Sequence, residues 1–372
     1  MADLTNNFHV ADVLSAMSGG VDSSVATKLL IDEGFDVIGV TMKLFGNSLI
    51  SYGQESRCCS LEDFDDAKKV CRKLGINHYV FNMKANFLDN VVERFCDSYI
   101  SGETPNPCID CNRHLKFGAL QQRRRELGAR YVATGHYARI GFDEAAGKYR
   151  LLRAADAAKD QSYVLYNLTQ DDLAHMLFPL GDLTKPQVRE IAREQGLINA
   201  EKSESQDICF IPDGDYATFI KEHRDLDDGA PSFREGDIVD ATGKKLGVHR
   251  GLIHYTIGQR KGIGLASSKP LYVIKKDAMR NELVVGHSEE LLTDEVRLRD
   301  VNVISGDYDE RDYHADVKIG YRSNAASAKV TILADRTAII HFDEAQVRMA
   351  PGQSAVAYIG DEVLCGGVAT QA

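Results

Sequence analysis

The sequence predicts an α/β domain built on a parallel sheet, followed by a smaller, largely antiparallel β region. Two observations carry this prediction. Up to about residue 213, short apolar strand-like runs alternate with helical segments, and this alternation specifies a parallel sheet covered by helices. Beyond residue 213, short apolar runs follow one another between turn residues, a pattern typical of small antiparallel barrels or sandwiches.

The expected elements of the first part follow from apolar runs and their end signals. Glycines close three of the expected helices, and Ser60 with Asp63 and Thr184 with Gln187 form capping-box patterns at two helix starts. The expected strands cover residues 12–17, 36–42, 78–82 and 131–134. The expected helices cover residues 21–33, 60–74, 87–100 and the segment from Thr184 to Gly196.

The later part of the chain is expected to hold most of the antiparallel strands. Alternation at residues 315–321 and the apolar runs 329–333, 338–342 and 355–359 are the clearest examples. Acidic, glycine-containing stretches at 213–215 and 227–229 are plausible joints. The predicted domains are therefore residues 1–213, 214–275 and 276–372.

Composition bounds the function. A chain of 372 residues is too long for one core, and a net charge of −11 argues against nucleic-acid binding by bulk charge. No apolar run approaches the roughly 18 residues that suggest a membrane span, and the start of the chain has no secretory pattern, so a cytoplasmic protein is expected, with no membrane partner. Eight cysteines then favour thiol or metal chemistry over structural disulfides.

The heptapeptide Ser18 to Ser24 joins the first expected strand to the first expected helix. Its two glycines allow a tight turn and a close approach of an anion to backbone N–H groups. The helix N-terminus adds partial positive charge, three serine hydroxyls offer donors, and Asp22 could help to hold Mg²⁺. No Gly-Lys-Ser/Thr is present, so this is not a Walker A loop. A plain glycine turn is the alternative interpretation.

This heptapeptide, SGGVDSS, resembles the PP-loop of the ATP pyrophosphatases, which adenylate a carbonyl oxygen and release pyrophosphate. Further matches resemble the bacterial tRNA-specific 2-thiouridylase family and extend over nearly the whole chain in that family's order. They are TPNPCIDCN at 104–112, ATGHY at 133–137, KDQSY at 159–163, DICFI at 207–211, GLIHYTIGQRKG at 251–262 and PGQSAV at 351–356.

The resemblance implies a PP-loop α/β domain, a small central domain and a C-terminal β-barrel. It implies ATP-dependent 2-thiolation of the wobble uridine, with the anticodon loop of tRNA as substrate. The ATP contacts that it implies are Ala16, Met17, Ser18, Gly19, Gly20, Val21, Asp22, Ser23, Met42 and Gly135. Without the resemblance, Met42 would be interpreted as core packing and Gly135 as a turn glycine.

The sulfur chemistry needs a nucleophile once the carbonyl oxygen has been adenylated, and a thiolate or persulfide suits this at neutral pH. By resemblance, Cys209 receives a persulfide from a donor protein, and Cys111 releases the sulfur or closes a disulfide with Cys209. Bridging requires the two Cα atoms to approach within about 7 Å, so a mobile segment around Cys209 is expected.

Cys108 departs from the family pattern, in which the best-described members have an Asp. Cys108, Cys111 and Cys209 could together hold a [4Fe–4S] cluster with one open iron. A persulfide relay, a zinc site, a Cys-x-x-Cys redox pair and buried inert thiols remain the alternatives. The cluster is preferred slightly to the relay, and the relay to zinc. Cys71, Cys96 and Cys365 are expected to be core residues, and no specific role is supported for Cys58 and Cys59.

Contacts to RNA are also implied by the resemblance. The contacts implied near the target base are Asn106, Pro107 and Cys108, and those implied elsewhere on tRNA are His136, Lys159, Asp160, Gln161, Tyr321 and Gln353. Within 249–261, His249, Arg250, Arg260 and Lys261 surround glycines and are expected to contact RNA; a basic hairpin loop is the plainer alternative. Gly320 replaces an Arg that many relatives have, so one backbone contact is expected to be missing.

Two other functions fit parts of the pattern. A small-molecule PP-loop ligase would keep the phosphate loop but would not need Cys111 and Cys209. A non-catalytic tRNA-binding or Fe–S scaffold protein would not need an intact SGGVDSS.

Overall fold

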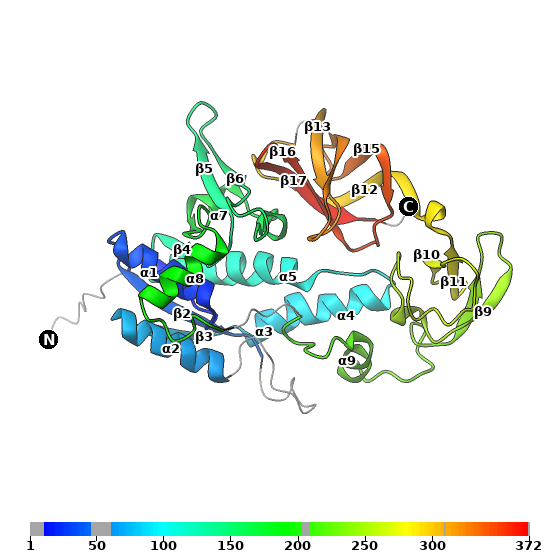
Figure 1. Ribbon diagram of the computed structural model, residues 1–372, viewed down its shortest axis with the longest axis horizontal. Helices are drawn as coiled ribbons and strands as arrows, with labels where there is room; N and C mark the ends of the chain where they lie inside the picture. The colour runs from blue at the N-terminus through cyan, green and yellow to red at the C-terminus, as the bar shows by residue number, and fades with distance from the viewer. Residues whose placement is uncertain (1–10, 46–60, 203–207, 309, 371–372) are drawn as a thin grey trace, which may run out of the picture. The chain divides into compact units, whose positions relative to one another are not determined.

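The computed structural model describes residues 11–45, 61–202, 208–308 and 310–370. The described chain forms two compact units (Figure 1). The first contains residues up to 88 together with 111–212, and the second contains 89–110 together with 213 onward. The interval 89–110 thus lies inside the stretch expected to form the first domain, yet it packs with the second unit.

The first unit is built on a parallel five-stranded sheet, as the alternation of elements predicts. The strand order is β3-β2-β1-β4-β7, and every neighbouring pair is parallel. The strands are β1 Val13–Ala16, β2 Val37–Lys43, β3 His78–Asn82, β4 Tyr131–Ala133 and β7 Met176–Leu177. Because the chain leaves β1 towards β2 on one side and returns to β4 on the other, the carboxyl ends of β1 and β4 form a topological switch point, where ligands of such sheets bind.

Three helices of this unit contribute to one apolar core: α1 Val21–Asp32, α2 Leu61–Leu74 and α8 Lys185–Glu194. Val25, Val70 and Val188 are fully buried in that core. The capping box of Thr184 and Gln187 at the start of α8 is confirmed. The other expected cap, Ser60, lies outside the described residues.

The helix expected at 87–100 is present but starts earlier and is not uniform. It consists of α3 Lys84–Phe87, a π-helical turn η1 Leu88–Val92 and α4 Glu93–Ile100. The buried apolar positions Phe87, Val91, Phe95 and Tyr99 recur every fourth residue, which exceeds the roughly 3.6 residues of an α-helical turn. A wider turn within the run keeps these side chains on one face.

A second helical run follows, with α5 Pro107–Asp110, the π-helix η2 Cys111–Ala119 and α6 Leu120–Leu127. The sequence gives no clear signal for several further elements of the first unit. These are the hairpin β5 Arg139–Asp143 and β6 Lys148–Leu152, the 3₁₀ turn η3 Ser162–Leu165 and the short helix α7 Gln170–Ala174.

The second unit contains a four-stranded sheet in the order β10-β11-β8-β9. Its strands are β8 Gly236–Val239, β9 Lys245–His249, β10 Tyr272–Asp277 and β11 Glu282–Gly286, and α9 Tyr216–His223 precedes them. Asp215, in a stretch predicted to be a joint, is the N-cap of α9. The predicted boundary between residues 275 and 276 falls inside β10.

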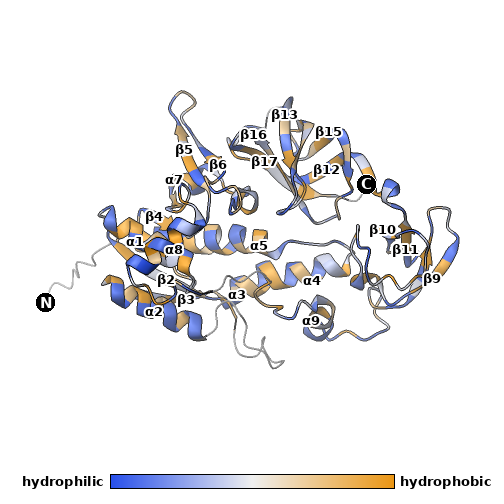
Figure 2. Cartoon of the chain, in the orientation of Figure 1, coloured by the Kyte–Doolittle hydropathy of each residue, from blue (hydrophilic) through white to orange (hydrophobic). Residues whose placement is uncertain are grey.

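The C-terminal β-barrel is confirmed. Six strands pair in sequence as β12-β15-β14-β13-β16-β17, and β17 pairs back with β12 to close the barrel. They are β12 Leu292–Val303, β13 Arg311–Lys318, β14 Ala325–Ile332, β15 Ala338–Val347, β16 Ser354–Ile359 and β17 Glu362–Ala369. Hydrophobic and hydrophilic residues alternate along these strands (Figure 2), and the inward ones, among them Val317, Val330 and Ile340, form one core.

Candidate active site

The loop between β1 and α1 presents the start of a helix at the carboxyl edge of the sheet. Gly20 is the N-cap of α1 and provides no side-chain cap, so the amides of Val21, Asp22 and Ser23 have no acceptor within the helix. Gly19 has φ +76°, and an added Cβ would lie 2.5 Å from the backbone oxygen of Asp63. Such amides, together with the positive end of the helix dipole, suit an anion such as phosphate.

The serine hydroxyls brace this loop. Ser23 Oγ and Ser24 Oγ each donate to the carbonyl of Gly20 at 3.0 Å, and the amide of Ser18 donates to Ser23 Oγ at 3.2 Å. In this structure the hydroxyls therefore shape the loop, and the amides of α1 are the groups available to a phosphate.

The loop after β4 packs directly on the first turn of α1. A Cβ added at Gly135 would lie 2.7 Å from the amide nitrogen of Ser23 and 2.8 Å from the carbonyl carbon of Asp22. Only a glycine allows this approach, so the structure gives Gly135 a physical reason beyond an ordinary turn. The two predicted nucleotide segments, 16–23 and Gly135, are thus brought together at the switch point between β1 and β4.

Asp22 forms a largely buried ion pair that was not predicted. Lys185 Nζ donates to both carboxylate oxygens of Asp22, at 2.6 and 2.8 Å, and Tyr137 Oη donates to Asp22 Oδ1 at 2.8 Å. Lys185 is only 8% exposed. A magnesium ion held by Asp22 would therefore have to share or replace the lysine contact, while the lysine itself suits a phosphate.

A signal for Lys185 was present in the sequence. It directly follows Thr184, the cap of α8, so a cation occupies the first turn of a helix, where the dipole disfavours positive charge. An ammonium group buried to this extent needs a partner of opposite charge. Asn199, also missed, holds the loop from another side, because its Nδ2 donates to Gly19 O at 3.0 Å and to Ser24 Oγ at 2.8 Å.

The remaining predicted nucleotide contacts lie on the ends of neighbouring strands. Ala16 ends β1, and Met17 follows it with a side chain that is 2% exposed and accepts a hydrogen bond from Thr27 Oγ1 at 2.9 Å. Met17 can thus face the loop only through its backbone. Met42 is half-buried near the carboxyl end of β2, beside β1.

His136, a predicted tRNA contact, is 7% exposed in the first unit. Its Nδ1 lies 2.7 Å from Thr134 Oγ1 and its Nε2 lies 3.4 Å from Lys116 Nζ. Burial, reinforced by the charge of Lys116, holds the pKa of His136 well below its ordinary value of 6.5. The ring is therefore neutral, with Nε2 as acceptor toward the lysine and Nδ1–H as donor to the threonine.

The predicted contacts at 159–161 are largely engaged in their own loop. The Asp160 carboxylate accepts from the amides of Ala154 and Ser162, both at 3.1 Å. The Gln161 side chain accepts from the amide of Tyr137 at 2.9 Å, next to His136. Lys159 is half-buried. Their predicted role in tRNA binding stays a prediction.

The segments of Cys111 and Cys209 both pack against α3. Cys111 is the first residue of η2, which contacts α3, and Phe210 makes an edge-on ring contact with Phe87 of α3 at a centroid distance of 5.6 Å. Both cysteines are half-buried. The charged stretch before Cys209 that is expected to give it mobility is KSESQD at 202–207, and all of it after Lys202 lies outside the described residues. The structure thus brings the two thiol-bearing segments to one region of the first unit.

Three other cysteines are core residues, as expected. Cys71, Cys96 and Cys365 are buried, and burial raises the pKa of the first two to about 11 and of Cys365 to about 12. Their thiols therefore stay protonated and unreactive at neutral pH. Cys58 and Cys59 lie outside the described residues.

Cys108 is exposed and belongs to the second unit. Asn106 caps the short helix α5, because its Oδ1 accepts from the amide of Cys108 at 3.1 Å, and Pro107 is buried at the helix start. Thiolates are the donors that an iron–sulfur cluster requires. Among the residues that the structure describes, no three His, Cys, Asp or Glu side chains are gathered as a metal site.

The predicted contacts on the barrel differ in exposure. Tyr321 is 41% exposed. Gln353 Nε2 instead donates to the carbonyl of Thr104 at 2.6 Å, and the amide of Thr104 donates to Pro351 O at 2.7 Å. Gly352 has φ +89°, and an added Cβ would lie 2.9 Å from Glu103 Cβ. The 351–353 loop therefore holds the start of the segment that carries Asn106 and Cys108.

The basic segment at 249–261 is partly corrected. His249 is fully buried, with Nε2 3.1 Å from the carbonyl of Asn281 and Nδ1 accepting from the amide of Gly251 at 3.1 Å. It is a core histidine whose hydrogen bonds fix the chain, and it does not face RNA. Arg250, Arg260 and Lys261 are exposed.

No helix in the described part of the chain is long and apolar enough to cross a membrane.

Three families match consecutive stretches of the chain. They are described as the tRNA methyl transferase HUP domain at 11–213, the tRNA methyl transferase PRC-barrel domain at 220–287 and the aminomethyltransferase beta-barrel domain at 293–369.

Curated relatives match nearly the full length. The tRNA-specific 2-thiouridylase MnmA of Clostridioides difficile (strain 630) is 46% identical over 356 residues, which cover 96% of this chain and 97% of the relative. The protein of the same name from Carboxydothermus hydrogenoformans is 45% identical, covering 95% and 96%. A solved 4-thiouridine synthetase–RNA complex with bound ATP is 19% identical and covers 54% of this chain and 45% of that chain, with a TM-score of 0.37.

Identity of this extent over both full lengths, together with the phosphate loop and the two thiol-bearing segments, places the chain in one family. The chain belongs to the tRNA-specific 2-thiouridylase family.

Proposed function

We propose that the protein adenylates the 2-oxygen of the wobble uridine of tRNA and replaces that oxygen with sulfur. The observation that carries the proposal is the convergence of a phosphate-binding helix start, the Gly135 loop and the buried Lys185 at one edge of the parallel sheet. The segments of Cys111 and Cys209 belong to the same unit. The relatives named as tRNA-specific 2-thiouridylases support the substrate.

In the activation step, the uridine 2-oxygen attacks the α-phosphorus of ATP and pyrophosphate leaves. The amides at the start of α1 would bind phosphate oxygens, and Lys185, released from Asp22, would neutralise the charge that builds up on them. Asp22 could then contact Mg²⁺, which would supply further positive charge when bound. The site residues from Ala16 to Ser23, Met42 and Gly135 are proposed as the nucleotide site.

In the transfer step, a donor protein leaves a persulfide on Cys209. The Cys111 thiolate attacks the inner sulfur, a Cys111–Cys209 disulfide forms, and the outer sulfur leaves with its electron pair and attacks C2 of the base. AMP departs with the former 2-oxygen, and an external thiol reopens the disulfide. A [4Fe–4S] cluster on Cys108, Cys111 and Cys209 is the alternative source of sulfide.

Substitution of the two cysteines tests the proposal by separating the two half-reactions. Cys111→Ala and Cys209→Ala should each keep tRNA-dependent pyrophosphate release and yield no 2-thiouridine, because only sulfur transfer needs the thiols. Cys71→Ala, which removes a buried thiol, is the matched control and should make normal amounts. Normal 2-thiouridine in both test variants, measured by nucleoside mass spectrometry, would show that these thiols are structural.

Cys108 discriminates between the two sulfur routes. In the relay Cys108 can be replaced with modest loss, whereas in a cluster enzyme Cys108→Ala should lose iron and activity together. Cys108→Asp should keep partial activity, since a carboxylate can also ligate iron. Iron and acid-labile sulfide are measured after anaerobic purification. Protein without iron that transfers sulfur from a persulfide donor at full rate would exclude the cluster.

Two of the matching family descriptions mention methyl transfer. The reaction products distinguish thiolation from methylation. Thiolation exchanges oxygen for sulfur and consumes ATP, whereas methylation adds a methyl group and releases no pyrophosphate. The phosphate loop, together with Cys111 and Cys209, favours thiolation.

A further inference from the structure

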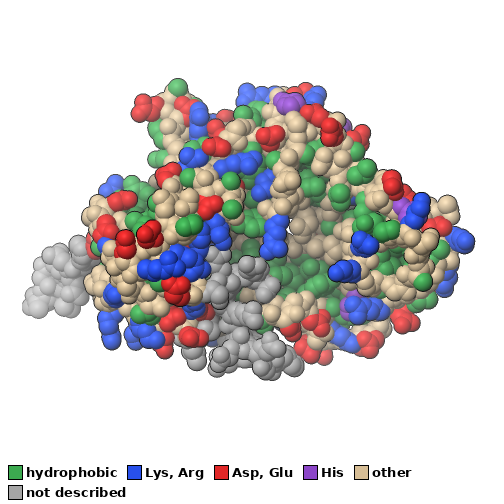
Figure 3. Space-filling model, viewed as in Figure 1, with side chains coloured by type: hydrophobic (Ala, Val, Ile, Leu, Met, Phe, Trp, Pro, Cys, Tyr) green, Lys and Arg blue, Asp and Glu red, His purple; other side chains and the backbone are tan. Residues whose placement is uncertain are grey.

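A basic segment in the middle sheet stands out against an acidic protein. Residues 241–276 contain eight Lys and Arg and no Asp or Glu, although the whole chain carries a net charge of −11. All of these cations except Lys276 are exposed. Lys and Arg side chains are frequent over the region of β9, β10 and β11 in Figure 3. A local excess of this kind is the electrostatic footprint of a polyanion partner.

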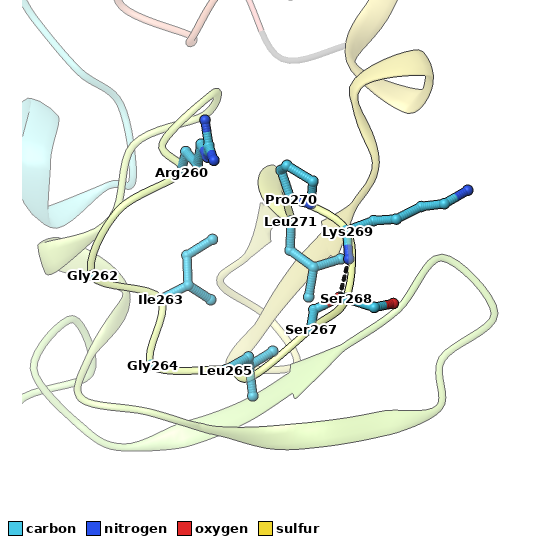
Figure 4. A pocket seen from close by; sticks show the side chains of 10 residues that line it. All are labelled: Arg260, Gly262, Ile263, Gly264, Leu265, Ser267, Ser268, Lys269, Pro270 and Leu271. Atoms are coloured by element: carbon cyan, nitrogen blue, oxygen red, sulfur yellow. Dashed lines mark hydrogen bonds between the residues drawn. The ribbon is translucent and has the colours of Figure 1, made fainter.

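A cavity of about 420 Å³ opens within this segment, between residues 260–265 and 267–271 (Figure 4). Its apolar side chains belong to the core of the middle sheet: Ile263 is 6% exposed, and Leu265 and Leu271 pack against the same core. Arg260 lies at one edge, and Lys269 extends outward from the other. The cavity therefore lies over the apolar core of the middle sheet and has cations at its rim.

The rim cations make few charge interactions inside the protein. Among the described residues, Arg260 and Lys261 form no ion pair, and Lys269 has a charge interaction with Glu289 but no ion pair within 4 Å. Lys245 in the same segment, by contrast, pairs with Asp237 at 2.6 Å. Core packing does not explain their positions, and no close ion pair holds them. They are available to an anion.

Glycines leave the backbone around the cavity uncovered. Gly258, Gly262 and Gly264 have φ values of +84°, +78° and +80°, and a Cβ added at Gly258 or Gly264 would meet no protein atom within 4 Å. Their conformation needs glycine, and the space beside them is open. A ligand can therefore approach the main chain closely at this loop.

We propose that this cavity is an RNA subsite, in which Arg260 and Lys269 bind phosphodiester groups of the tRNA and an adjoining nucleotide packs on the half-buried side chains of Leu265 and Leu271. RNA fits because it repeats a negative charge at every nucleotide and offers flat apolar faces. The inference rests on the proposed function, since it concerns the same substrate.

The test is tRNA binding as a function of salt. Arg260→Gln/Lys269→Gln should weaken binding roughly tenfold at moderate salt and reduce the slope of log Kobs against log[salt] by about 1 per lost phosphate contact. The KM for tRNA should rise, whereas the KM for ATP should not change. The control Lys245→Gln/Lys329→Gln removes two lysines that the structure pairs with acidic groups at 2.6 and 2.7 Å, and should leave the slope nearly unchanged.

Each outcome decides a separate claim. Equal affinity and equal slope for the test variant and wild type would overturn the subsite, and so would an equal fall in the control. Normal tRNA binding with loss of sulfur transfer only from a protein donor, and not from inorganic sulfide, would reassign the cavity to that donor. Failure of the wild-type chain to bind tRNA at all would instead defeat the proposed function.

Discussion

Asp22 and Lys185 show how one contact links two distant parts of the chain to the phosphate loop. Lys185 is held at the start of α8 with its ammonium group on both oxygens of Asp22. Removal of one partner of a largely buried pair leaves the other charge uncompensated, which is more damaging than loss of both. The pair therefore keeps a cation at the helix start until a phosphate competes for it.

Lys185→Met should reduce tRNA-dependent pyrophosphate release by roughly 10²–10³, the usual loss for one charge-stabilising group. Asp22→Asn should also reduce it strongly, because it removes the same pair and the predicted magnesium contact. Lys28→Met is the control, since Lys28 lies on α1 and pairs with Asp32 away from the loop. Melting curves check that each variant folds. Wild-type release by a folded Lys185→Met protein would remove Lys185 from the site.

At the scale of elements, the N-terminus of α1 is where three segments meet. The loop after β4 contacts it through Gly135, Asn199 bonds to the loop from the residues that follow α8, and the backbone of Asp63 in α2 closes on Gly19. Each contact involves main chain and leaves little room for a larger side chain. The phosphate loop is therefore fixed in shape before any ligand binds.

Gly135→Ala should raise the KM for ATP and lower kcat, because its Cβ would lie 2.7 Å from Ser23 N and would push the two segments apart. Gly320→Ala is the matched control: its nearest neighbour, Ser323, is 4.0 Å away, so ordinary contact results. Initial rates at varied ATP concentration give both constants. Unchanged kinetics in Gly135→Ala would mean that this approach does not shape the nucleotide site.

Local patterns predicted the elements that have a strong period or a clear end signal. The parallel sheet, the α8 capping box and the barrel strands follow from such patterns. The hairpin at 139–152 did not, because its five-residue strands are mostly half-buried and have no consistently buried face, and Phe142 is 54% exposed. The π-helical turn at 88–92 depends on tertiary packing, which a helical period does not report.

The site was predictable where one short motif contains it, as in residues 16–23. Lys185, Tyr137 and Asn199 were missed because their partners lie more than a hundred residues away, and only folding brings them to the loop. His249 was assigned to a basic surface because neighbouring cations suggested it, whereas its two ring hydrogen bonds place it in the core.

At the scale of the whole molecule, we propose three domains with limits near 1–213, 214–275 and 276–372. Pairing of β10 with β11 favours moving the last limit beyond Gly286.

Lys276 on β10 is a weak point of the second unit: it is 6% exposed, and its Nζ, among the described atoms, has no hydrogen-bond partner. Burial lowers its pKa from 10.5 to about 8.

Lys276→Met should stabilise the second unit by about 3 kcal/mol at pH 7, the free energy that corresponds to this pKa shift. In wild type the unfolded chain binds more protons than the folded one between pH 8 and 10.5, so wild-type stability rises with pH in that window. The advantage of the variant should therefore shrink as the pH rises from 8 to 10.5. Denaturant unfolding at several pH values measures it, and a constant difference would contradict a buried, largely unpaired ammonium group.

The measurement that tests the central claim most directly is the ratio of pyrophosphate released to 2-thiouridine formed by the purified protein with ATP, tRNA and a sulfur donor. The proposed function predicts release that depends on tRNA, one pyrophosphate for each 2-thiouridine, and sulfur located at the wobble position by nucleoside mass spectrometry. Pyrophosphate release that does not need tRNA, or a tRNA that gains a methyl group and no sulfur, would contradict it.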